Sequence, residues 1–461
     1  MERILTVTAL KKINQKILIK GWVNAVREHG KITFFDLRDR SGVVQIVTQQ
    51  KIELKPESVV AVTGKVVKRP EKLVNPKLAT GKIEIQAEKI EIITQAKELP
   101  FPVLSDGHDI DETVRLKYRY LDLRRPRLNQ IIRTRSRVVR FIREYLFKQD
   151  FVEIETPILT KTTPEGARDF LVPSRLQPGN FYALPQSPQQ YKQLLMVAGF
   201  ERYFQIAKCF RDEDPRHDRA YGEFTQLDLE MSFVEQNDIL QLIEAMFTAL
   251  VKEIFPQKNI SRSPWPRIPH REATTKYGSD KPDLRKNKKN PDELAFAWIV
   301  DFPLFTEQSK EDYYYGSGQA RFAPSHHMFT APHPDDIPLL DKNPLQVRGL
   351  QHDLVLNGYE VGGGSIRIHD PKVQQKVFDL IGFTKEQAKQ FEHMLTAFFY
   401  GVPPHGGVAP GIDRLLMAIL GETSVREVMA FPAVASGKTA VMEAPSPATA
   451  EQLKELHLKI I

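Results

Sequence analysis

The sequence has 461 residues, of which 41% are hydrophobic and 27% charged, and its 65 Lys and Arg exceed its 58 Asp and Glu by 7. The length suits roughly two to four domains, and the composition excludes a disordered chain and a single small binding module. The one cysteine, Cys209, excludes an intramolecular disulfide and a multi-cysteine zinc site. The sequence has no signal-like N-terminus and no long apolar stretch, so we expect a cytoplasmic protein that does not contact membranes.

The excess positive charge lies at the N-terminus. Residues 1–100 contain 19 Lys and Arg against 11 Asp and Glu, a balance of +8, whereas residues 101–461 balance to −1. A basic first domain joined to a nearly neutral larger one fits nucleic-acid binding by the first and chemistry by the second. A basic surface that faces only solvent is the alternative that the charge leaves open.

The first predicted elements are short strands between Lys16 and Ile93, separated by turn signals that contain Gly and Asp. Five such strands in a basic unit predict an oligonucleotide-binding β-barrel over residues 1–100, although another small barrel has the same pattern. Proline-punctuated residues 101–130 then predict a linker. The apolar runs that define the five strands are 17–19, 32–35, 43–47, 59–62 and 83–85.

A second domain is predicted over residues 131–461. It begins with a long helix from about residue 129 to 149, after which strands alternate with helices. The polar residues that alternate along these strands favour an antiparallel sheet, flanked by helices, with one face open to a ligand, and the whole protein is predicted to be α+β. The predicted strands are 203–206, 223–233, 297–302, 353–358 and 363–368, and a short basic connector covers 286–297.

Three segments carry charged residues in positions that a core would not accept. Residues 209–214 and 223–230 predict a hairpin whose Arg can clamp a phosphate, with a surface ion pair as the simpler alternative. Residues 357–369 contain three consecutive glycines, which indicate either close approach to a ligand or a bulge, and Asp353 with Glu360 can bind Mg²⁺. Gly411–Arg414 opens an apolar helix, which suits contact with a polyphosphate.

Taken together and in this order, the Arg hairpin, the acidic pair with its glycine run and the Gly-x-Asp-Arg turn resemble the ordered set found in the class II aminoacyl-tRNA synthetases. Residues 151–157 resemble motif 1 of that family, Phe210–Glu213 motif 2 and Gly411–Arg414 motif 3. Within the family, segments 163–169, 186–193, 277–283 and 360–369 are similar to the aspartyl enzymes of bacterial type. The side-chain carboxylate of aspartate needs a cationic pocket, which Lys192 and Arg367 can provide.

The resemblance implies that aspartate and ATP react to give aspartyl-adenylate and pyrophosphate, and that the tRNA end then receives the aspartyl group. It implies catalytic roles for Arg211, Glu213 and Arg414, with Mg²⁺ bound by Asp353 and Glu360. For His326, a surface or core role is the alternative to substrate binding. The implied ATP-binding set is Arg211, Asp212, Glu213, Phe224, Glu360, Gly411, Ile412, Asp413 and Arg414; the implied aspartate-binding set is Glu165, Ser187, Gln189, Lys192, Arg211, Gln226, Asp228, His326 and Arg367.

In the barrel, the resemblance assigns anticodon recognition to Trp22, Arg27, Phe34 and Gln45. An exposed Phe can stack on an unpaired base, and because alternation puts Phe34 and Phe35 on opposite faces, we expect Phe34 to be the exposed one. The implied partners are ATP, L-aspartate and tRNA(Asp), with tRNA(Asn) left open. Motif 1 implies a homodimer with Pro157 at its interface.

Two features depart from the family pattern. Bacterial aspartyl enzymes carry a large inserted domain where this chain has only residues 286–297, a deletion that is either natural or engineered. The loop 218–224 is one residue longer than the usual form and lacks a glutamine near adenine, so Tyr221 is the candidate to replace it.

Two other functions are alternatives to this one. A tRNA-independent ligase on the same catalytic fold would have no use for the basic barrel. A non-catalytic RNA-binding relative would be expected to lose some of its costly charged residues, yet this chain retains Arg211, Glu213, Glu360, Arg367 and Arg414.

Overall fold

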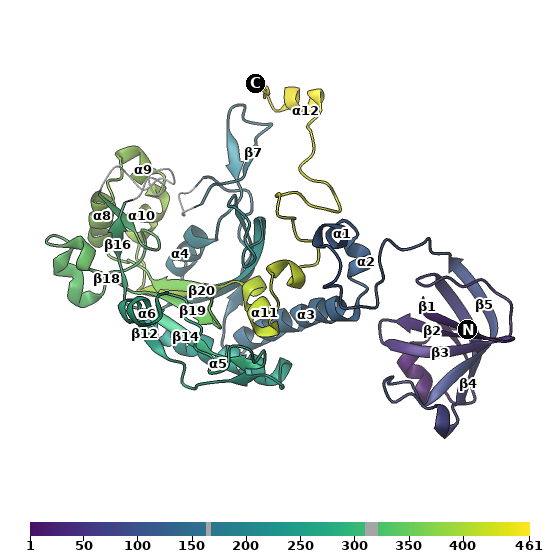
Figure 1. Ribbon diagram of the computed structural model, residues 1–461. Helices are drawn as coiled ribbons and strands as arrows, with labels where there is room; N and C mark the ends of the chain where they lie inside the picture. The colour runs from purple at the N-terminus through teal and green to yellow at the C-terminus, as the bar shows by residue number, and fades with distance from the viewer. Residues whose placement is uncertain (163–166, 309–320) are drawn as a thin grey trace. The chain divides into compact units, whose positions relative to one another are not determined.

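The computed structural model describes residues 1–162, 167–308 and 321–461, which form two compact units, Met1–Pro102 and Val103–Ile461 (Figure 1). Nearly all of the segment 101–130, predicted as a linker, is therefore part of the second unit. It forms helices α1 (Glu112–Lys117) and α2 (Arg119–Asp122) and the first turn of α3 (Pro126–Phe147). The prolines of this segment predicted a linker, but Pro126 occupies the first turn of a helix, where the missing N–H of proline has no hydrogen bond to lose.

The first unit is a closed five-stranded barrel in the order β1-β2-β3-β5-β4, which confirms the predicted barrel. Its interior is filled by alternate side chains, among them the fully buried Phe35, Leu37 and Ile46. The strands are β1 (Lys16–His29), β2 (Ile32–Asp39), β3 (Gly42–Thr48), β4 (Val59–Lys68) and β5 (Ile83–Thr94), and 3-10 turns cover Thr6–Lys11 and Glu71–Leu73.

The second unit is built on an eight-stranded sheet in the order β12-β14-β19-β20-β21-β10-β9-β6. Its six central strands are antiparallel, as predicted, while the edge strands β6 and β12 pair in parallel with their neighbours. The strands are β6 (Val152–Glu153), β9 (Arg202–Arg211), β10 (Gly222–Ser232), β12 (Arg267–Pro269), β14 (Phe296–Val300), β19 (Gln351–Leu356), β20 (Tyr359–Ile366) and β21 (His405–Pro410). The α+β class is confirmed.

The main core lies between this sheet and three helices: α3, α5 (Gln236–Ile254) and α11 (Ile412–Leu420). Leu227 and Leu229 of β10 belong to this core. Because side chains alternate along a strand, Gln226, Asp228 and Glu230 point to the opposite face of the sheet. That face is the one predicted to be open to a ligand.

A smaller core around Phe329 and Phe378 joins α8 (Pro371–Leu380) and α10 (Glu392–Phe398) to loops beyond the sheet. Among the described helices, none has both the length and the apolar character needed to cross a membrane. The remaining elements are α4 (Gln189–Val197), α6 (His270–Tyr277), α9 (Lys385–Lys389), α12 (Ala450–Glu455) and short strands at Leu171–Pro173, Phe181–Ala183, Asn259–Ile260, Glu293–Leu294, Phe302–Pro303, Phe305–Glu307, Phe322–Pro324 and Arg348–Gly349.

The connector 286–297 is a compact turn held by its own polar groups. The carboxylate of Glu293 accepts hydrogen bonds from the backbone N–H groups of Lys286 (2.9 Å) and Asn287 (3.1 Å). Lys258 donates to the carbonyl of Pro291 at 2.8 Å. The connector is thus held both by its own Glu293 and by the segment 258–260, with which its residues Glu293 and Leu294 form a short parallel ladder.

Two of the three glycines of β20, Gly362 and Gly364, are required by close packing against β21. A Cβ on Gly364 would overlap the backbone of Gly407 in β21, and one on Gly362 would lie 2.8 Å from Cα of Pro410. The pairing between β19 and β20 has an extra residue, Val361 of β20, directly before the glycines, because Leu354 pairs with Gly362 and Val355 with Glu360. A bulge therefore adjoins the glycine run, as one of the two interpretations expected. The glycines also line the pocket described below, and their close approach to a ligand stays a prediction.

We predict that Gly364→Ala lowers the free energy of unfolding of the second unit by about 2 kcal/mol or more, because the added methyl group must push β20 away from β21. Gly411→Ala is the matched control, since a Cβ there meets nothing closer than an oxygen of Val361 at 3.9 Å. Thermal and urea unfolding of both variants measure the difference. Equal stability of the two variants would contradict the packing argument.

Candidate active site

Most of the predicted site residues line a single pocket on the polar face of the sheet. They come from β9, β10, β20, α4, α11 and the loops beside them. Of the other predicted residues, Ile412 is fully buried in the core, Asp212 and Asp353 lie outside the lining, and Glu165 lies outside the described residues. The predicted residues that line the pocket are Ser187, Gln189, Lys192, Arg211, Glu213, Phe224, Gln226, Asp228, His326, Glu360, Arg367, Gly411, Asp413 and Arg414.

A buried group of two cations and two carboxylates forms one end of the pocket. Lys192 Nζ lies 2.7 Å from Asp228 Oδ1 and 3.3 Å from Glu230 Oε2. Arg367 contacts the same Glu230, through Nε at 2.9 Å and Nη2 at 3.2 Å. All four side chains are at most 2% exposed. The two cations therefore sit at fixed positions, neutralised from the side of β10.

Glu230 is not among the predicted site residues, because the resemblance assigned the orientation of the two cations to Asp228. It lies two residues after Asp228 on the same strand and so shares its face of the sheet. That spacing is the signal that could have found it. Because Glu230 contacts both Lys192 and Arg367 whereas Asp228 contacts Lys192, Glu230 makes the larger contribution to placing the pair.

The two carboxylates differ in pKa. Burial raises the pKa of both, but Arg367 and Lys192 outweigh burial at Glu230 and lower its pKa to about 2. At Asp228, burial dominates over Lys192 and the pKa is raised. Glu230 is therefore the permanently ionised partner of the two cations.

Two histidines close the pocket beside the cations. His326 lines the pocket as predicted, and its neighbour His327, not predicted, has Nε2 2.6 Å from Arg367 Nη1. Burial and the charge of Arg367 lower the pKa of His326 to about 4, and burial with the proximity of His326 lowers the pKa of His327 well below its usual value. Both rings are neutral near pH 7 and add no third cation.

Behind α4 a short polar chain fixes the predicted Gln189. Its Nε2 donates to Gln193 Oε1 at 3.0 Å, and Gln193 Nε2 lies 3.0 Å from His405 Nε2. His405 Nδ1 lies 2.8 Å from the carbonyl of Pro403, so Nδ1 is the donor and Nε2 accepts from Gln193. The whole chain is buried, which orients the amide of Gln189 before any ligand arrives.

The other end of the pocket carries Arg211, Phe224 and Arg414. The guanidinium carbon of Arg211 lies 5.1 Å from the ring centre of Phe224. Arg414 donates to the carbonyl oxygens of Asp218 (2.8 Å) and Glu360 (3.0 Å). A planar cation and an aromatic face at this end suit a phosphate and a base.

Residues of the loop after β9 hold two of the predicted ATP-binding groups. Arg219 forms an ion pair with Glu213, and Asp218 lies 3.5 Å from Arg414. Both loop residues line the pocket but were not predicted as site residues. Their positions follow from the loop conformation, which the sequence pattern does not specify.

Tyr221, the candidate to replace glutamine at the adenine, is not part of the pocket lining. Its hydroxyl donates to Asp212 Oδ1 at 3.2 Å, and its ring packs edge-on against Phe170, with centroids 6.1 Å apart. A Cβ on Gly437 would lie 3.0 Å from the same ring. Tyr221 therefore ties the hairpin to flanking segments, and its replacement of the glutamine stays a prediction that its position outside the pocket lining does not support.

Asp413 has a structural role that the sequence did not indicate. Its Oδ1 lies 2.5 Å from Arg135 Nη1 of α3, and its Oδ2 accepts the backbone N–H of Thr225 at 2.8 Å. Both oxygens are thus engaged by protein groups. Asp413 fixes the start of α11, and with it the neighbouring Arg414.

The predicted metal ligands, Asp353 and Glu360, lie on the paired strands β19 and β20. Burial and the charge of Glu360 raise the pKa of Asp353, whereas Lys281, at 2.9 Å, contributes to lowering the pKa of Glu360 against its burial. In the described ranges no group of three or more His, Cys, Asp and Glu side chains is arranged to hold a metal. A cation at this pair would need further ligands from a substrate.

On the barrel, alternation puts all four predicted anticodon residues on the outer side of β1, β2 and β3, where Arg27 is exposed and Trp22 and Phe34 are half-buried, whereas Gln45 is buried, with 8% of its surface exposed. Phe34 pairs with Arg27, and Phe34 is half-buried while Phe35 is fully buried, so the predicted orientation of this pair is confirmed. Arg27 lies 3.1 Å from Asp36, and Gln45 donates to Glu84 at 3.1 Å. Trp22 pairs with Arg38, which lies four residues after Phe34 on β2 and therefore on the same face.

Pro157, predicted at a dimer interface, lies on the surface of the second unit. The next two residues are also exposed, Ile158 by 49% and Leu159 by 53%. Adjacent exposed apolar residues are unusual on a surface that faces only water. This exposed patch is compatible with a subunit contact.

Family models match both units. Residues 111–435 match tRNA synthetases class II (D, K and N), and residues 17–93 match the OB-fold nucleic acid binding domain. These matches, together with the sheet and its charged pocket, define a class II synthetase catalytic domain joined to an OB-fold barrel.

Curated relatives define the group within that class. The Aspartate--tRNA(Asp/Asn) ligase of Rubrobacter xylanophilus is 42% identical over 97% of this chain and 95% of its own length, and the Aspartate--tRNA ligase of Geobacillus kaustophilus is 41% identical over 97% of each. The chain belongs to the aspartate–tRNA ligase family of class II aminoacyl-tRNA synthetases. The first alignment runs over 580 positions, so at least 580 − 461 = 119 of them have no residue in this chain.

Solved structures share the fold. Asparaginyl-tRNA synthetase from Pyrococcus horikoshii, complexed with asparaginyl-adenylate, superposes with a TM-score of 0.74 at 22% identity, covering 94% of this chain and 98% of that one. Aspartyl tRNA synthetase from Entamoeba histolytica gives 0.73 at 23% identity, covering 94% and 91%. At this identity the likeness concerns the fold.

We predict that Glu230→Gln lowers the free energy of unfolding by about 3–5 kcal/mol near pH 7, because it leaves two buried cations without their shared carboxylate. Since the pKa of Glu230 is lowered from 4.5 to about 2, its stabilising contribution is present above about pH 4.5 and is lost as the pH falls through about 2. The difference from the unmodified protein should therefore shrink in acid. Urea unfolding at several pH values measures it.

The control is Glu144→Gln, which removes the carboxylate of an exposed pair with Arg140. This change should alter stability only slightly at any pH. A deficit of Glu230→Gln that does not depend on pH would contradict the assigned ionisation.

Proposed function

We propose that the protein activates L-aspartate with ATP to aspartyl-adenylate and transfers the aspartyl group to the 3′ end of tRNA(Asp). The observation that carries this proposal is the pair Lys192 and Arg367, buried side by side at one end of the pocket and held by Glu230. A carboxylate side chain finds two fixed cations there, whereas the neutral amide of asparagine would leave them less well paired.

In the activation step, an oxygen of the aspartate α-carboxylate attacks the α-phosphorus of ATP, and the bond to the pyrophosphate leaving group breaks. Arg211 would bind the α-phosphate and the α-carboxylate together, which holds the reacting groups in line and offsets the charge that builds up between them. Phe224 and Arg414 would bind the adenine and phosphates, with Glu213 beside them. The neutral His326, Ser187, Gln189 and Gln226 would surround the amino acid.

Mg²⁺ is the proposed cofactor, held by Glu360 and Asp353 with oxygens of the ATP phosphates. The raised pKa of Asp353 fits this role, because a carboxylate beside another carboxylate is stabilised in its ionised form by a shared cation. When bound, Mg²⁺ would neutralise phosphate charge. Lys281 would have to release Glu360, which it contacts at 2.9 Å.

The barrel would read the anticodon through Trp22, Arg27, Phe34 and Gln45. The support is their common position on the outer face, with an aromatic ring for stacking and polar groups for base edges. Of the relatives of this chain, one is named Aspartate--tRNA(Asp/Asn) ligase and another Aspartate--tRNA ligase, without a named tRNA. We propose tRNA(Asp) as substrate and tRNA(Asn) as a second substrate to be tested.

We also propose that the enzyme works in the cytoplasm as a homodimer. The single buried cysteine suits a reducing compartment. The exposed apolar residues around Pro157 would be covered by a second copy of the chain.

The test is aminoacylation with radiolabelled aspartate on purified tRNA(Asp) and tRNA(Asn) transcripts, with aspartate-dependent ATP–pyrophosphate exchange measured beside it. We expect exchange with aspartate and charging of tRNA(Asp). Charging of both transcripts would identify a non-discriminating enzyme. Arg211→Ala serves as the inactive control, and exchange that survives in it, or is absent from the unmodified protein, would overturn the proposal.

We predict that Phe34→Ala lowers kcat/KM for charging of tRNA(Asp) by about tenfold or more, since stacking on one base contributes about 1–3 kcal/mol. Pyrophosphate exchange should stay unchanged, because it does not involve tRNA. Lys89→Ala is a control on the same barrel, with a side chain 75% exposed on β5. Equal charging by the two variants would remove Phe34 from the anticodon site.

A further inference from the structure

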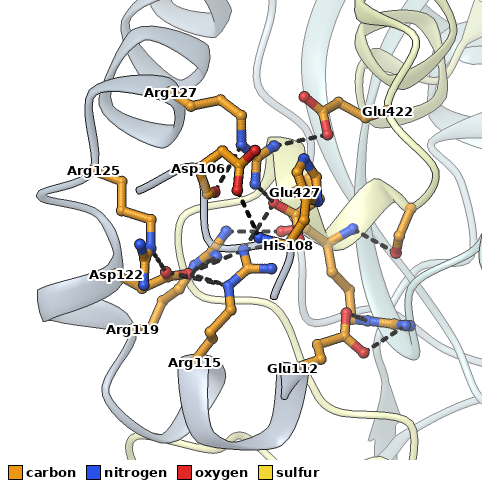
Figure 2. Close-up of polar contacts among 12 residues, drawn as sticks. Asp106, His108, Glu112, Arg115, Arg119, Asp122, Arg125, Arg127, Glu422 and Glu427 are labelled. Carbon is orange, nitrogen blue, oxygen red and sulfur yellow. Dashed lines mark hydrogen bonds and ion pairs between the residues drawn. The ribbon is translucent and has the colours of Figure 1, made fainter. Parts of the chain in front are cut away.

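A second buried charged cluster lies in the helices that follow the barrel. Figure 2 shows Arg115, Arg119 and Arg125 directed at the carboxylate of Asp122, at 3.2, 2.8 and 2.6 Å. Asp122 is fully buried, and the three arginines are at most 4% exposed. One carboxylate cannot neutralise three guanidinium groups, so the arginines must have further partners elsewhere in the chain.

Arg125 finds its further partner nearby, in the carbonyl and hydroxyl of Ser105, at 3.0 and 2.9 Å. The further partners of Arg115 and Arg119 belong to one segment, residues 422–430, which follows helix α11. Arg119 donates to the backbone carbonyls of Arg426 (2.8 Å), Met429 (2.8 Å) and Ala430 (3.1 Å). Arg115 donates to both carboxylate oxygens of Glu427 at 3.0 Å. Residues more than 300 positions apart in sequence are thus joined by buried, charge-assisted bonds.

Two more arginine contacts complete the attachment. Arg127, at the start of α3, donates to Glu422 at 2.8 Å and to Glu427 at 2.6 Å (Figure 2). In the reverse direction, Arg426 of the segment donates to Glu112 of α1 at 2.8 and 3.0 Å. The segment 422–430 is therefore held from several sides.

The same segment contacts the ATP end of the pocket. Its residue Val425 lines the pocket, and the N–H of Val425 donates to the carbonyl of His217 at 3.0 Å. His217 adjoins Asp218, whose carbonyl accepts a hydrogen bond from Arg414 at 2.8 Å. A shift of the segment would therefore move the loop that holds Arg414.

A parallel contact leads from α3 to the same arginine. Arg135 donates to the carbonyl of Val428 at 3.3 Å and pairs with Asp413, the residue before Arg414. The cations at the aspartate end have different supports: within the described residues, Lys192 and Arg367 contact β10, Ser365 and His327. The cluster is thus connected to one end of the pocket.

We propose that Asp122 and Arg119 are positioning residues for ATP, which fix the segment 422–430 and through it His217, Asp218 and Arg414. The inference rests on the proposed aspartate activation, because it assigns this end of the pocket to ATP. Neither residue lines the pocket, so their effect on ATP passes through the segment.

The experiment measures KM for ATP and KM for aspartate separately in pyrophosphate exchange. Arg119→Lys keeps the charge, but one ammonium group cannot bond to three carbonyls in the geometry of a guanidinium. Asp122→Asn leaves the arginines without their carboxylate. For both variants we expect KM for ATP to rise about tenfold or more while KM for aspartate changes less than about twofold.

Controls separate positioning from loss of stability. Glu144→Gln removes an exposed ion pair of α3 and should change neither KM. Glu112→Gln loosens only the half-exposed end of the cluster and should raise KM for ATP by a smaller factor. If Asp122→Asn does not fold, Arg119→Lys and Glu112→Gln decide the question, with thermal unfolding measured for each.

Equal rises of both KM values, or lower stability with unchanged KM for ATP, would overturn the positioning role. Failure of the proposed function has a different signature, because the unmodified protein would then lack aspartate-dependent exchange. In that case, titration calorimetry with ATP alone compares the unmodified protein with Arg119→Lys. Weaker ATP binding by the variant supports the positioning role, and equal binding refutes it.

Discussion

The carboxylate of Glu230 is the group on which the pocket depends. Lys192 and Arg367 are both withdrawn from water, and two like charges in such a place are stable only if a shared anion lies between them. Strand β10 supplies this anion because alternation directs Asp228 and Glu230 away from the apolar core. The neighbouring strand leaves room for it, since a Cβ on Gly407 would overlap Glu230 Oε2.

This arrangement has consequences for recognition. Carboxylates of strand β10 hold the two cations on the side that faces the sheet. The adjacent side chains of His326 and His327 remain neutral. A ligand carboxylate entering from the open side therefore meets positive charge whose position is already fixed, so little reorganisation is needed on binding. Recognition of this kind favours a charged side chain over its amide, because the amide would leave buried donors less well satisfied.

The two ends of the pocket are supported in different ways. The end proposed for aspartate depends on one strand and its immediate neighbours. The end proposed for ATP includes Val425 and Arg414, held through contacts with α1, α2 and α3. Buried ion pairs add little net stability compared with apolar packing, but removing one partner leaves an uncompensated charge. Such pairs therefore fix the relative position of segments that are distant in sequence. The cluster around Asp122 does this for residues 103–130 and 422–430.

The sequence by itself determined the strands of the barrel, five of the six central strands of the sheet, the helix α3 and most of the residues that line the pocket; the central strand β21 was not predicted. These depend on local alternation and on motifs whose spacing is visible in the chain. It also indicated which of Phe34 and Phe35 faces outward, because period-two alternation needs no tertiary information.

Only the tertiary structure decided which groups meet across long separations. Glu230, His327 and the arginines around Asp122 acquire their roles from partners on other elements. The prediction of a linker over residues 101–130 was wrong because proline at a helix start looks the same in sequence as proline in a connection. Tyr221 likewise faces Phe170 and Asp212 instead of the pocket. Local pattern encodes the face on which a side chain lies, but the partner on that face is set by packing between distant segments.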